Sequence, residues 1–534
     1  MRKQILLLLF PFTLFAQQIT LEWLNSKPKG VYKDFYIWQY LNQDIKPSQA
    51  LKAIEQVRYL NHKIFHRFSQ KYNDDSYKLY SKCVKMGTKK LIKQKDYCIE
   101  SGLSFYDATK LSKNELTGVI EKLNKNYPAF SKRLNILNSP APFKALLKSD
   151  NKTFFNTFNE CGSVYRLKHF NETFPLEFLN RLKSNEKDFD RTVKRIVTNL
   201  DMKKAQRSLL YLPSKNISYK TLFHLAINAI RHGEEKFALN YLDQAYKKAY
   251  YQMEKDNITF WQYLLTKEEK YLKKLSSSWD VNIYSIYANE KLNKPLDNIV
   301  FNIKQNGKSS SYNVNDPFKW LYVLNDTKKK MGDTKMQKYN NLFSSEDTLP
   351  HLAFVKERYD RYKNSYFITP FKDIVSKYDN KRKTLIYSIA RQESRFIPTS
   401  ISFAYAMGTM QIMPFLSKAI AKELNDPYDI YKQLDPSVNI KYADHHLDYL
   451  ERKLKHPLLI AYAYNGGIGF TTRSLQKGLF EKGKYEPFLS MELLQFDETK
   501  KYGKKVLANY YVYYNLLNKE KIKISELLKS AVKK

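Results

Sequence analysis

Glu393 is the residue whose type and position in the sequence best suit catalysis. Apolar residues at helical spacing predict a helix over about residues 381–397, and Glu393 lies on its apolar face, near its C-terminal end. Neither water nor the helix dipole stabilises a negative charge there, so we expect the pKa of this carboxyl to be raised. A carboxyl that stays protonated near neutral pH can act as a general acid on a glycosidic oxygen. The alternative is a structural glutamate that snorkels to solvent or pairs with Arg391 or Arg395.

Three motifs follow Glu393 in chain order. After Ser402 comes GTMQIMP, which spans residues 408–414. LLIAYAYNGG, over 458–467, predicts an apolar helix that delivers Tyr464 and Asn465 to a glycine turn, where the backbone can approach a ligand closely. The segment FDETKKYGKKVLANYYVYY follows, and its polar and aromatic residues of interest are Glu498, Tyr502, Tyr510 and Tyr513.

A further helix is expected between the first two motifs. Asp435 can cap its N-terminus, and Pro436 suits its first turn. The positions that form its apolar stripe are Ile440, Ala443, Leu447, Leu450 and Leu454. This helix is therefore a core element that supports the motifs on either side.

The ordered set of motifs resembles the soluble lytic transglycosylases of bacterial cell-wall metabolism, whose catalytic domain is similar to goose-type lysozyme. The resemblance rests on a Glu-Ser pair, a G-x-M-Q-I-M-P loop fifteen residues beyond Glu393, an A-Y-N-x-G turn and an E-T-x-x-Y helix, and it covers about residues 381–515. It implies an all-α protein in which an irregular superhelix, ring-forming in this family, precedes a lysozyme-like catalytic domain.

The resemblance also implies roles for individual residues. It makes Glu393 the single catalytic acid/base, and it places Ser402 near the substrate's N-acetyl group or the catalytic carboxyl. The residues that it places along the groove or against the sugar and peptide of the substrate are Gln411, Met413, Tyr464, Asn465, Glu498 and Tyr502. Tyr513 is the choice for a further tyrosine of the last helix, although Tyr510, Tyr511 and Tyr514 compete for that role.

Four positions depart from the family pattern. Thr409 stands where leucine is usual, Gly466 where alanine is usual, and Phe403 and Tyr405 where small residues are common. These departures affect the expected shape of the groove and the preferred glycan length, but they do not affect Glu393.

The reaction implied by the resemblance is cleavage of the β-1,4 bond between N-acetylmuramic acid and N-acetylglucosamine, with a 1,6-anhydro sugar as product. A hydrolytic muramidase is the alternative, since a two-carboxylate enzyme activates water or attacks the sugar with a second acid. The acids available for that role are Asp426, Asp429, Asp435, Asp444 and Glu498. An alternative from another class is a helical scaffold that binds glycan without cutting it.

The region before the motifs reads as repeated amphipathic helices with short polar breaks. One pair covers 219–230 and 234–249, with the break at His232-Gly233. No strict repeat period is present, so an irregular α-superhelix is expected. We predict three parts: a signal peptide over 1–16, a scaffold over 17–362 that includes a linker region at about 305–362, and a catalytic domain over 363–534.

Composition and charge fit this interpretation. The chain has 534 residues, 43% of them hydrophobic, with only 15 Gly and 18 Pro, which excludes a disordered chain and favours long helices. The formal net charge of +38 indicates an anionic partner, or else a chain-wide bias in which lysines solvate helix faces. We expect peptidoglycan strands and muropeptides as partners, together with other cell-wall enzymes. RNA-binding aromatic signatures and zinc-finger spacing are missing, so nucleic acid is not expected.

The start of the chain predicts export. Residues 1–16 combine two basic residues, an apolar run and Ala16 before polar residues, which is typical of a cleaved signal peptide, with an uncleaved anchor as the alternative. The mature chain is then expected in the periplasm without a membrane span. Export allows one disulfide, with Cys83 and Cys98 as the pair that closes a short loop; three buried thiols, with Cys161 as the third, are the alternative.

No cofactor or metal is expected. Residues 478–484 match most of a phosphate-binding loop, but Tyr485 replaces the required Ser or Thr. His445 and His446 are adjacent, so they cannot share one helix face as zinc ligands do.

Overall fold

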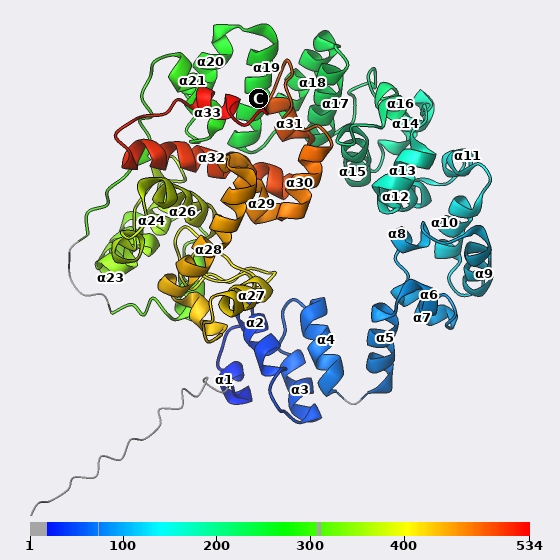
Figure 1. Cartoon of the computed structure of the whole chain (residues 1–534), viewed down its shortest axis with the longest axis horizontal. Helices are drawn as coiled ribbons and strands as arrows, with labels where there is room; N and C mark the ends of the chain where they lie inside the picture. The colour runs from blue at the N-terminus through cyan, green and yellow to red at the C-terminus, as the bar shows by residue number, and fades with distance from the viewer. Residues whose placement is uncertain (1–18, 73, 306, 308–310, 534) are drawn as a thin grey trace, which may run out of the picture. The chain divides into compact units, whose positions relative to one another are not determined.

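The computed structural model describes residues 19–72, 74–305, 307 and 311–533 (Figure 1). The expected signal peptide over 1–16 lies outside these residues. The described chain holds 33 α-helices and a single two-stranded parallel sheet, so the predicted all-α class is confirmed. Across the described residues, no helix is both long and apolar enough to cross a membrane.

The chain divides into two compact units. Of the described residues, the first contains those up to Lys82 together with Ile401–Tyr405, and the second contains those within 83–400 and 406–533. One apolar core runs through the second unit, from the scaffold helices to the C-terminal helices. The division therefore differs from the predicted domain boundary at 362/363, which stays a prediction.

The first unit is built from short helices. Its helices are α1 (Leu21–Asn25), α2 (Val31–Tyr40), α3 (Pro47–Ile54) and α4 (His62–Lys71), followed by α5 (Asp75–Lys85), which continues into the second unit. Side-chain caps fix two of the helix starts: Thr20 accepts from the backbone N–H of Trp23, and Asn61 accepts from those of Lys63 and Ile64.

The scaffold part of the second unit is a succession of packed helices. They are α6 (Thr88–Leu91), α7 (Asp96–Gly102), α8 (Phe105–Ala108), α9 (Lys113–Leu123), α10 (Pro128–Asn138), α11 (Pro142–Leu147), α12 (Asn151–Glu160), α13 (Gly162–Phe170), α14 (Leu176–Leu182), α15 (Glu186–Val197), α16 (Lys203–Arg207), α17 (Tyr219–Arg231), α18 (Glu235–Lys248), α19 (Gln252–Thr266), α20 (Glu269–Ser276) and α21 (Ile283–Lys291). Helices α17 and α18 pack together and turn at His232-Gly233, as predicted; the positive φ of Gly233 (79°) suits glycine.

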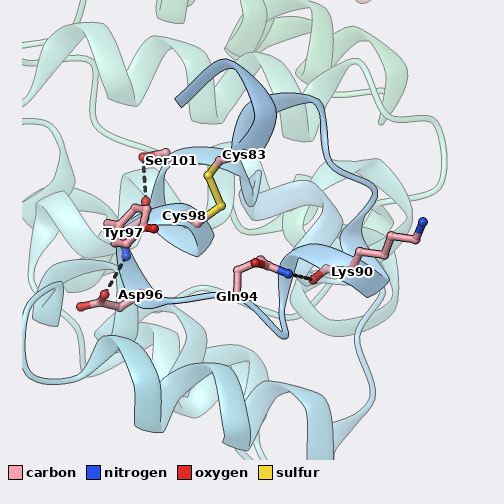
Figure 2. Close-up of a disulfide and its surroundings, with 7 residues drawn as sticks. All are labelled: Cys83, Lys90, Gln94, Asp96, Tyr97, Cys98 and Ser101. Carbon is pink, nitrogen blue, oxygen red and sulfur yellow. Dashed lines mark hydrogen bonds between the residues drawn. A yellow bond between two sulfur atoms is a disulfide. The ribbon is translucent and has the colours of Figure 1, made fainter. Parts of the chain in front are cut away.

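A disulfide fastens the start of this scaffold. Cys83 of α5 is bonded to Cys98 of α7, with Cα atoms 5.2 Å apart, and Figure 2 shows the bond beside the polar contacts of α7. The predicted pairing is therefore found in the structure, and Cys161 is a buried free thiol.

The predicted linker region contains more structure than its composition indicates. Its elements and those just after it are β1 (Ile299–Val300), α22 (Pro317–Asp326), α23 (Asp333–Leu342), the 3₁₀ helix Glu346–Thr348, α24 (Leu349–Tyr359), β2 (Ser365–Tyr366) and α25 (Lys372–Val375). Strand β1 pairs with β2 in parallel, with Ile299 opposite Ser365.

The last group of helices carries the sequence motifs. It consists of α26 (Asn380–Glu393), α27 (Pro414–Glu423), the 3₁₀ helix Tyr431–Leu434, α28 (Pro436–Leu454), α29 (Pro457–Gly466), α30 (Ile468–Gln476), α31 (Phe488–Leu493), α32 (Asp497–Leu517) and α33 (Ile524–Lys529). Helix α32 packs against both α26 and α29 (Figure 1), so three separate motifs meet along its length.

Candidate active site

Glu393 is the last residue of α26. Asp379 caps the start of this helix by accepting from the N–H of Arg382, and Leu385, Ile386 and Ile389 bury its apolar face. Glu393 continues that face and is half-buried. The helix thus presents one carboxyl at its C-terminal end, where an uncompensated negative charge is disfavoured.

The surroundings of Glu393 favour its protonated form. Burial raises the pKa of Glu393 to about 8; a hydrogen bond from Tyr502 opposes that rise, and the negative charge of Glu498 adds to it. The Tyr502 hydroxyl donates to Oε1 of Glu393 at 2.7 Å. The carboxyl can therefore carry a proton at neutral pH and is poised as a general acid.

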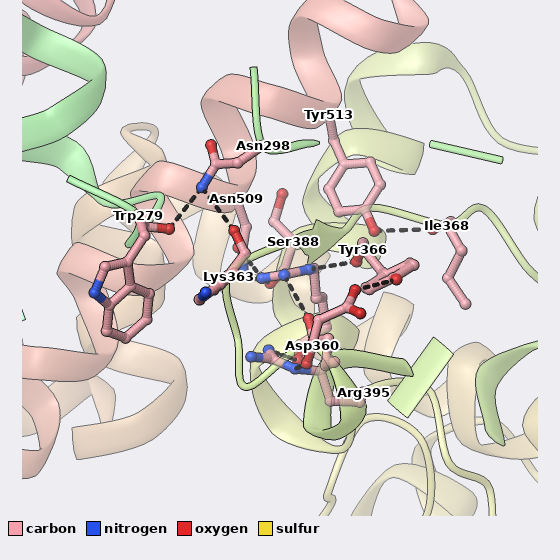
Figure 3. A network of polar contacts seen from close by, with 12 residues as sticks. Trp279, Asn298, Asp360, Lys363, Tyr366, Ile368, Ser388, Arg395, Asn509 and Tyr513 are labelled. Atoms are coloured by element: carbon pink, nitrogen blue, oxygen red, sulfur yellow. Dashed lines mark hydrogen bonds and ion pairs between the residues drawn. The ribbon is translucent and has the colours of Figure 1, made fainter. Parts of the chain in front are cut away.

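The two arginines nearest in sequence pair with another glutamate. Arg391 and Arg395 bind the two carboxylate oxygens of Glu357, at 3.0 and 2.9 Å. The structural alternative, in which one of them neutralises Glu393, is therefore not what the structure shows. Arg391 also donates to the carbonyl of Tyr366 and to the Asn509 side chain, both at 2.9 Å, within the polar network of Figure 3.

Two tyrosines flank the Glu393 carboxyl. Tyr502 comes from α32, and Tyr464 comes from α29, where its hydroxyl donates to the carbonyl oxygen of Met410 at 2.7 Å. Burial and the negative charge of Glu393 both raise the pKa of each phenol well above its ordinary value. Two of the residues expected at the site therefore lie beside the expected catalytic acid.

The GTMQIMP loop is fixed by contacts that require its glycine. Gly408 has φ of +80°, and a Cβ there would lie 2.1 Å from the carbonyl oxygen of Gln433. Asn439 of α28 accepts from the N–H of Met410 at 2.7 Å and donates to the carbonyl of Met407 at 3.1 Å. The buried side-chain amide of Asn439 thus fixes the backbone of the loop.

The same loop is tied to the end of α26. Ser394, the partner in the Glu-Ser pair, donates to the carbonyl of Thr409 at 2.7 Å. Gln411 turns its amide inward and donates to the carbonyls of Ser400 (3.0 Å) and Gly408 (2.8 Å). Gln411 and Met413 are half-buried, and their expected place along a substrate groove stays a prediction.

The A-Y-N-x-G turn meets the start of α32. Asn465 donates to Glu498 at 3.4 Å and accepts from the Thr499 hydroxyl at 2.7 Å. A Cβ on Gly466 would lie 2.8 Å from that hydroxyl oxygen. The close approach of Thr499 explains why glycine stands where the family usually has alanine.

Most of the alternative acids have other structural roles. Asp426 pairs with Lys441 at 2.6 Å, and Asp444 lies 3.2 Å from Arg382. Asp429 accepts from the N–H of Tyr431, and Asp435 caps α28 as predicted. Of the five acids considered for a second catalytic carboxylate, only Glu498 influences the pKa of Glu393.

The segment Ile401–Tyr405 belongs to the first unit. Tyr405 is 1% exposed; its ring packs against Phe35 and Trp38, and its hydroxyl accepts from Asn61 at 2.9 Å. Phe403 is exposed, with its ring against that of Tyr59. Of the two large residues that depart from the family pattern, Tyr405 therefore packs this segment, while Phe403 contacts Tyr59 at the surface. The expected role of Ser402 in the same segment stays a prediction.

Tyr513 does not suit the expected contact with substrate. Its side chain is completely buried, its hydroxyl donates to the carbonyl of Ile368 at 2.8 Å (Figure 3), and its ring packs against Phe367 and Tyr387. The substrate-binding role predicted for Tyr513 is replaced by a structural one, because this face of α32 is turned toward the core.

Three important residues escaped the sequence interpretation. Asn439 accepts a hydrogen bond from the GTMQIMP loop, and Thr499 donates one to Asn465 of the glycine turn. Glu357 forms the ion pairs with Arg391 and Arg395, which therefore do not pair with Glu393. Asn439 could have been singled out as a polar residue on the buried side of an otherwise apolar helix. No group of acidic, histidine and cysteine side chains suited to a metal ion is present among the described residues.

Comparison with known proteins places the motifs in a family context. Residues 372–485 match the family model described as "Transglycosylase SLT domain". A Haemophilus influenzae relative is 35% identical over 146 residues, covering 26% of this chain and 24% of its own. The soluble lytic murein transglycosylase of Escherichia coli K12 is 31% identical over 154 residues, covering 28% of this chain and 23% of its own. The matched segments thus span about a quarter of these relatives.

The fold extends the similarity beyond the matched segment. The structure resembles that of a lytic transglycosylase from Pseudomonas aeruginosa, solved as an inactive mutant, with a TM-score of 0.50 and 14% identity over 94% of this chain and 90% of that chain. The resemblance to soluble lytic transglycosylases indicated by the motifs is confirmed.

Proposed function

We propose that the chain is a lytic transglycosylase that cleaves peptidoglycan between N-acetylmuramic acid and N-acetylglucosamine. The observation that carries this proposal is the position of Glu393, half-buried, flanked by two tyrosines and without a cationic partner among its described contacts. The matching family model and the relatives support the reaction class.

The proposed mechanism uses Glu393 twice. The protonated carboxyl first donates its proton to the glycosidic oxygen, and the bond between that oxygen and C1 of the muramic acid breaks. The 6-hydroxyl then attacks C1 and gives its proton to the Glu393 carboxylate, which restores the acid. The product is a 1,6-anhydro sugar, and no water is consumed. Tyr502 supports this cycle, because its hydroxyl can stabilise the carboxylate between the two steps.

Fragments released from purified sacculi test the proposal. Mass spectrometry should find ends that are one water lighter than those of hydrolytic products. Reducing ends would instead identify a hydrolytic muramidase. Glu498 would then be the first residue to replace in the search for a second catalytic carboxylate, since its charge acts on Glu393. Binding to sacculi without any release would favour the glycan-binding scaffold.

We also propose a periplasmic location and an electrostatic attraction to the anionic cell wall. Residues 1–16 have the composition of an export signal, and the formal charge of +38 favours an anionic polymer. Binding to sacculi should weaken as salt rises from low to physiological concentration. Assembly with other cell-wall enzymes stays a prediction.

A further inference from the structure

A large cleft lies in the scaffold, apart from the residues that surround Glu393. Its volume is about 1130 Å³, and it is formed by helices from α7 to α15. Four aromatic side chains, Phe105, Tyr106, Tyr127 and Phe130, line it together with three arginines, Arg133, Arg191 and Arg195. The disulfide between α5 and α7 fastens the scaffold just before the segment that supplies Phe105 and Tyr106 (Figure 2).

Positive residues outnumber acidic ones in the cleft: Lys132 and Lys152 line it besides the three arginines, against Glu100, Asp150 and Glu160. Glu160 faces the arginines, but it already pairs with Arg133 at 2.5 Å. Arg133 is further held by the carbonyl of Asn156 at 2.9 Å and by the ring of Phe105, whose centroid lies 4.0 Å from the guanidinium carbon. Asp150 pairs with Lys132 at 2.7 Å. These two carboxylates are therefore occupied.

Arg191 and Arg195 have no carboxylate partner among the ion pairs of the described residues. The Nε atom of Arg195 is buried and lacks a hydrogen-bond partner there. Burial, and then the positive charges of Arg166 and Arg191, lower the pKa of Arg195 to about 10. Arg191 is exposed and Arg195 is half-buried, and both line the cleft, so their remaining N–H groups can receive an acceptor from outside.

A fourth arginine, buried behind the cleft wall, adds positive charge near Arg195. Arg166 is 2% exposed, and its guanidinium donates to the carbonyls of Phe158 (2.8 Å) and Asn159 (3.4 Å). Carbonyl oxygens satisfy its hydrogen bonds without neutralising it. The cleft wall therefore combines an aromatic surface with a fixed excess of positive charge.

We propose that this cleft binds a carboxylate-bearing peptide, with Arg191 and Arg195 as the residues that receive the carboxylate. An arginine fork matches a carboxylate in two parallel hydrogen bonds, and the aromatic side chains can pack against the peptide. If the proposed function holds, on which this assignment of the ligand rests, the peptide is the stem of peptidoglycan, whose free carboxylates are the negative charges of the substrate.

The test measures calorimetric binding of a synthetic stem peptide to the full chain. The double variant Arg191→Ala/Arg195→Ala should bind it roughly tenfold to a hundredfold more weakly, the loss expected for hydrogen bonds to a charged group. The matched control is Lys203→Ala/Arg207→Ala, which removes two positive charges from exposed positions of α16 and should bind like the parent chain. A peptide with amidated carboxylates should bind weakly to the parent.

Two results would overturn the proposal. One is parental affinity in the Arg191→Ala/Arg195→Ala variant; the other is displacement of the peptide by inorganic phosphate at equal concentration, which indicates a general anion site. Arg191→Lys/Arg195→Lys keeps the charge, so recovery of part of the affinity would show that a loss in the alanine variant does not come from misfolding.

A separate readout distinguishes this proposal from the proposed function. The double variant should cut peptide-free glycan at the parental rate and peptide-bearing sacculi more slowly. If the parent chain cut neither substrate, the proposed function would fail, while the peptide titration would still report on the cleft.

Discussion

Glu357 of α24, which is buried, and Glu393 of α26, which is half-buried, occupy opposite electrostatic environments. Burial alone would raise the pKa of Glu357, but Arg395 and Arg391 outweigh it and hold that pKa below its ordinary value. Glu393 has a phenol as its hydrogen-bond partner, and its pKa is raised to about 8. The comparison shows that the partner decides the protonation state, and burial alone does not.

A third glutamate supports the same conclusion. Glu492 of α31 is 3% exposed and contacts Lys504 of α32, with Lys500 at 3.9 Å. Burial tends to raise its pKa, but the two lysines outweigh burial and lower it. Two of these three glutamates thus have cationic partners that serve the fold, and Glu393 has none among the described ion pairs.

Of these three glutamates, Glu393 is the residue whose replacement should reduce turnover most. Glu393→Gln keeps the size of the side chain but cannot transfer a proton, so release of fragments from sacculi should fall by about 10² to 10⁴. The matched control is Glu526→Gln, at an exposed position of α33, which should leave the rate unchanged. Retained activity in Glu393→Gln would refute the assignment of the acid.

Glu357 should be essential to stability. Glu357→Gln leaves the buried Arg391 without its carboxylate, and breaking a buried pair in this way costs about 3 to 5 kcal/mol of unfolding free energy. Denaturant unfolding of the variant and the parent measures the change. Replacing the three residues together, as Glu357→Leu/Arg391→Met/Arg395→Met, should cost less because no charge is left unpaired. Equal stability of Glu357→Gln and the parent would show that the ion pair between Glu357 and Arg391 does not stabilise the fold.

Glu393→Gln should have the opposite effect on stability. Between pH 4.5 and about 8 the folded chain holds a proton that the unfolded chain has lost, so the contribution of Glu393 to the unfolding free energy falls as pH rises. Glutamine does not titrate, so the variant should gain roughly 1 to 3 kcal/mol over the parent at neutral pH. Thermal unfolding at several pH values checks this. The gain should be absent below pH 4.5 and constant above pH 8, and a gain independent of pH would count against the raised pKa.

The sequence was sufficient to predict much of this site, because its features are local. An apolar stripe that ends in a carboxyl indicated Glu393, and the Asp-Pro pair indicated the start of α28; both depend on residues within one or two helical turns. The glycine pattern also indicated the turn after Asn465, where Gly467 has φ of +86°.

Features that depend on distant contacts were not predictable in the same way. Glu357 meets Arg391 from 34 residues earlier, and no periodic pattern links the two. Tyr510 and Tyr513 are both buried on α32, and only the packing of α26 and of the chain near Ile368 determines that the Tyr513 hydroxyl meets the carbonyl of Ile368. The scaffold cleft is similar, since Arg133 comes from α10 and Arg191 and Arg195 come from α15.

Tyr502 should influence the pKa of Glu393 without itself transferring the proton. Its hydroxyl stabilises the ionised form of Glu393, so Tyr502→Phe should raise the pKa of that carboxyl and move the alkaline limit of kcat/KM to higher pH. The rate should also fall, by about tenfold, since one hydrogen bond to the carboxylate is lost between the two steps. A pH profile with an unchanged alkaline limit would show that Tyr502 does not act on Glu393. Tyr514→Phe, on the same helix, is the control.

Replacing Glu498 should shift the pKa of Glu393 least, and in the opposite direction to Tyr502→Phe. Its negative charge is the weakest of the three influences on Glu393, and its removal lowers the pKa of the acid. Glu498→Gln should therefore move the alkaline limit to lower pH by a fraction of a unit, and added salt should shrink the difference, because Glu498 is exposed and its field is screened. Glu423→Gln, exposed on α27, should leave the limit in place. A shift of Glu498→Gln toward higher pH would contradict this, since a carboxylate beside Glu393 can only disfavour its ionisation.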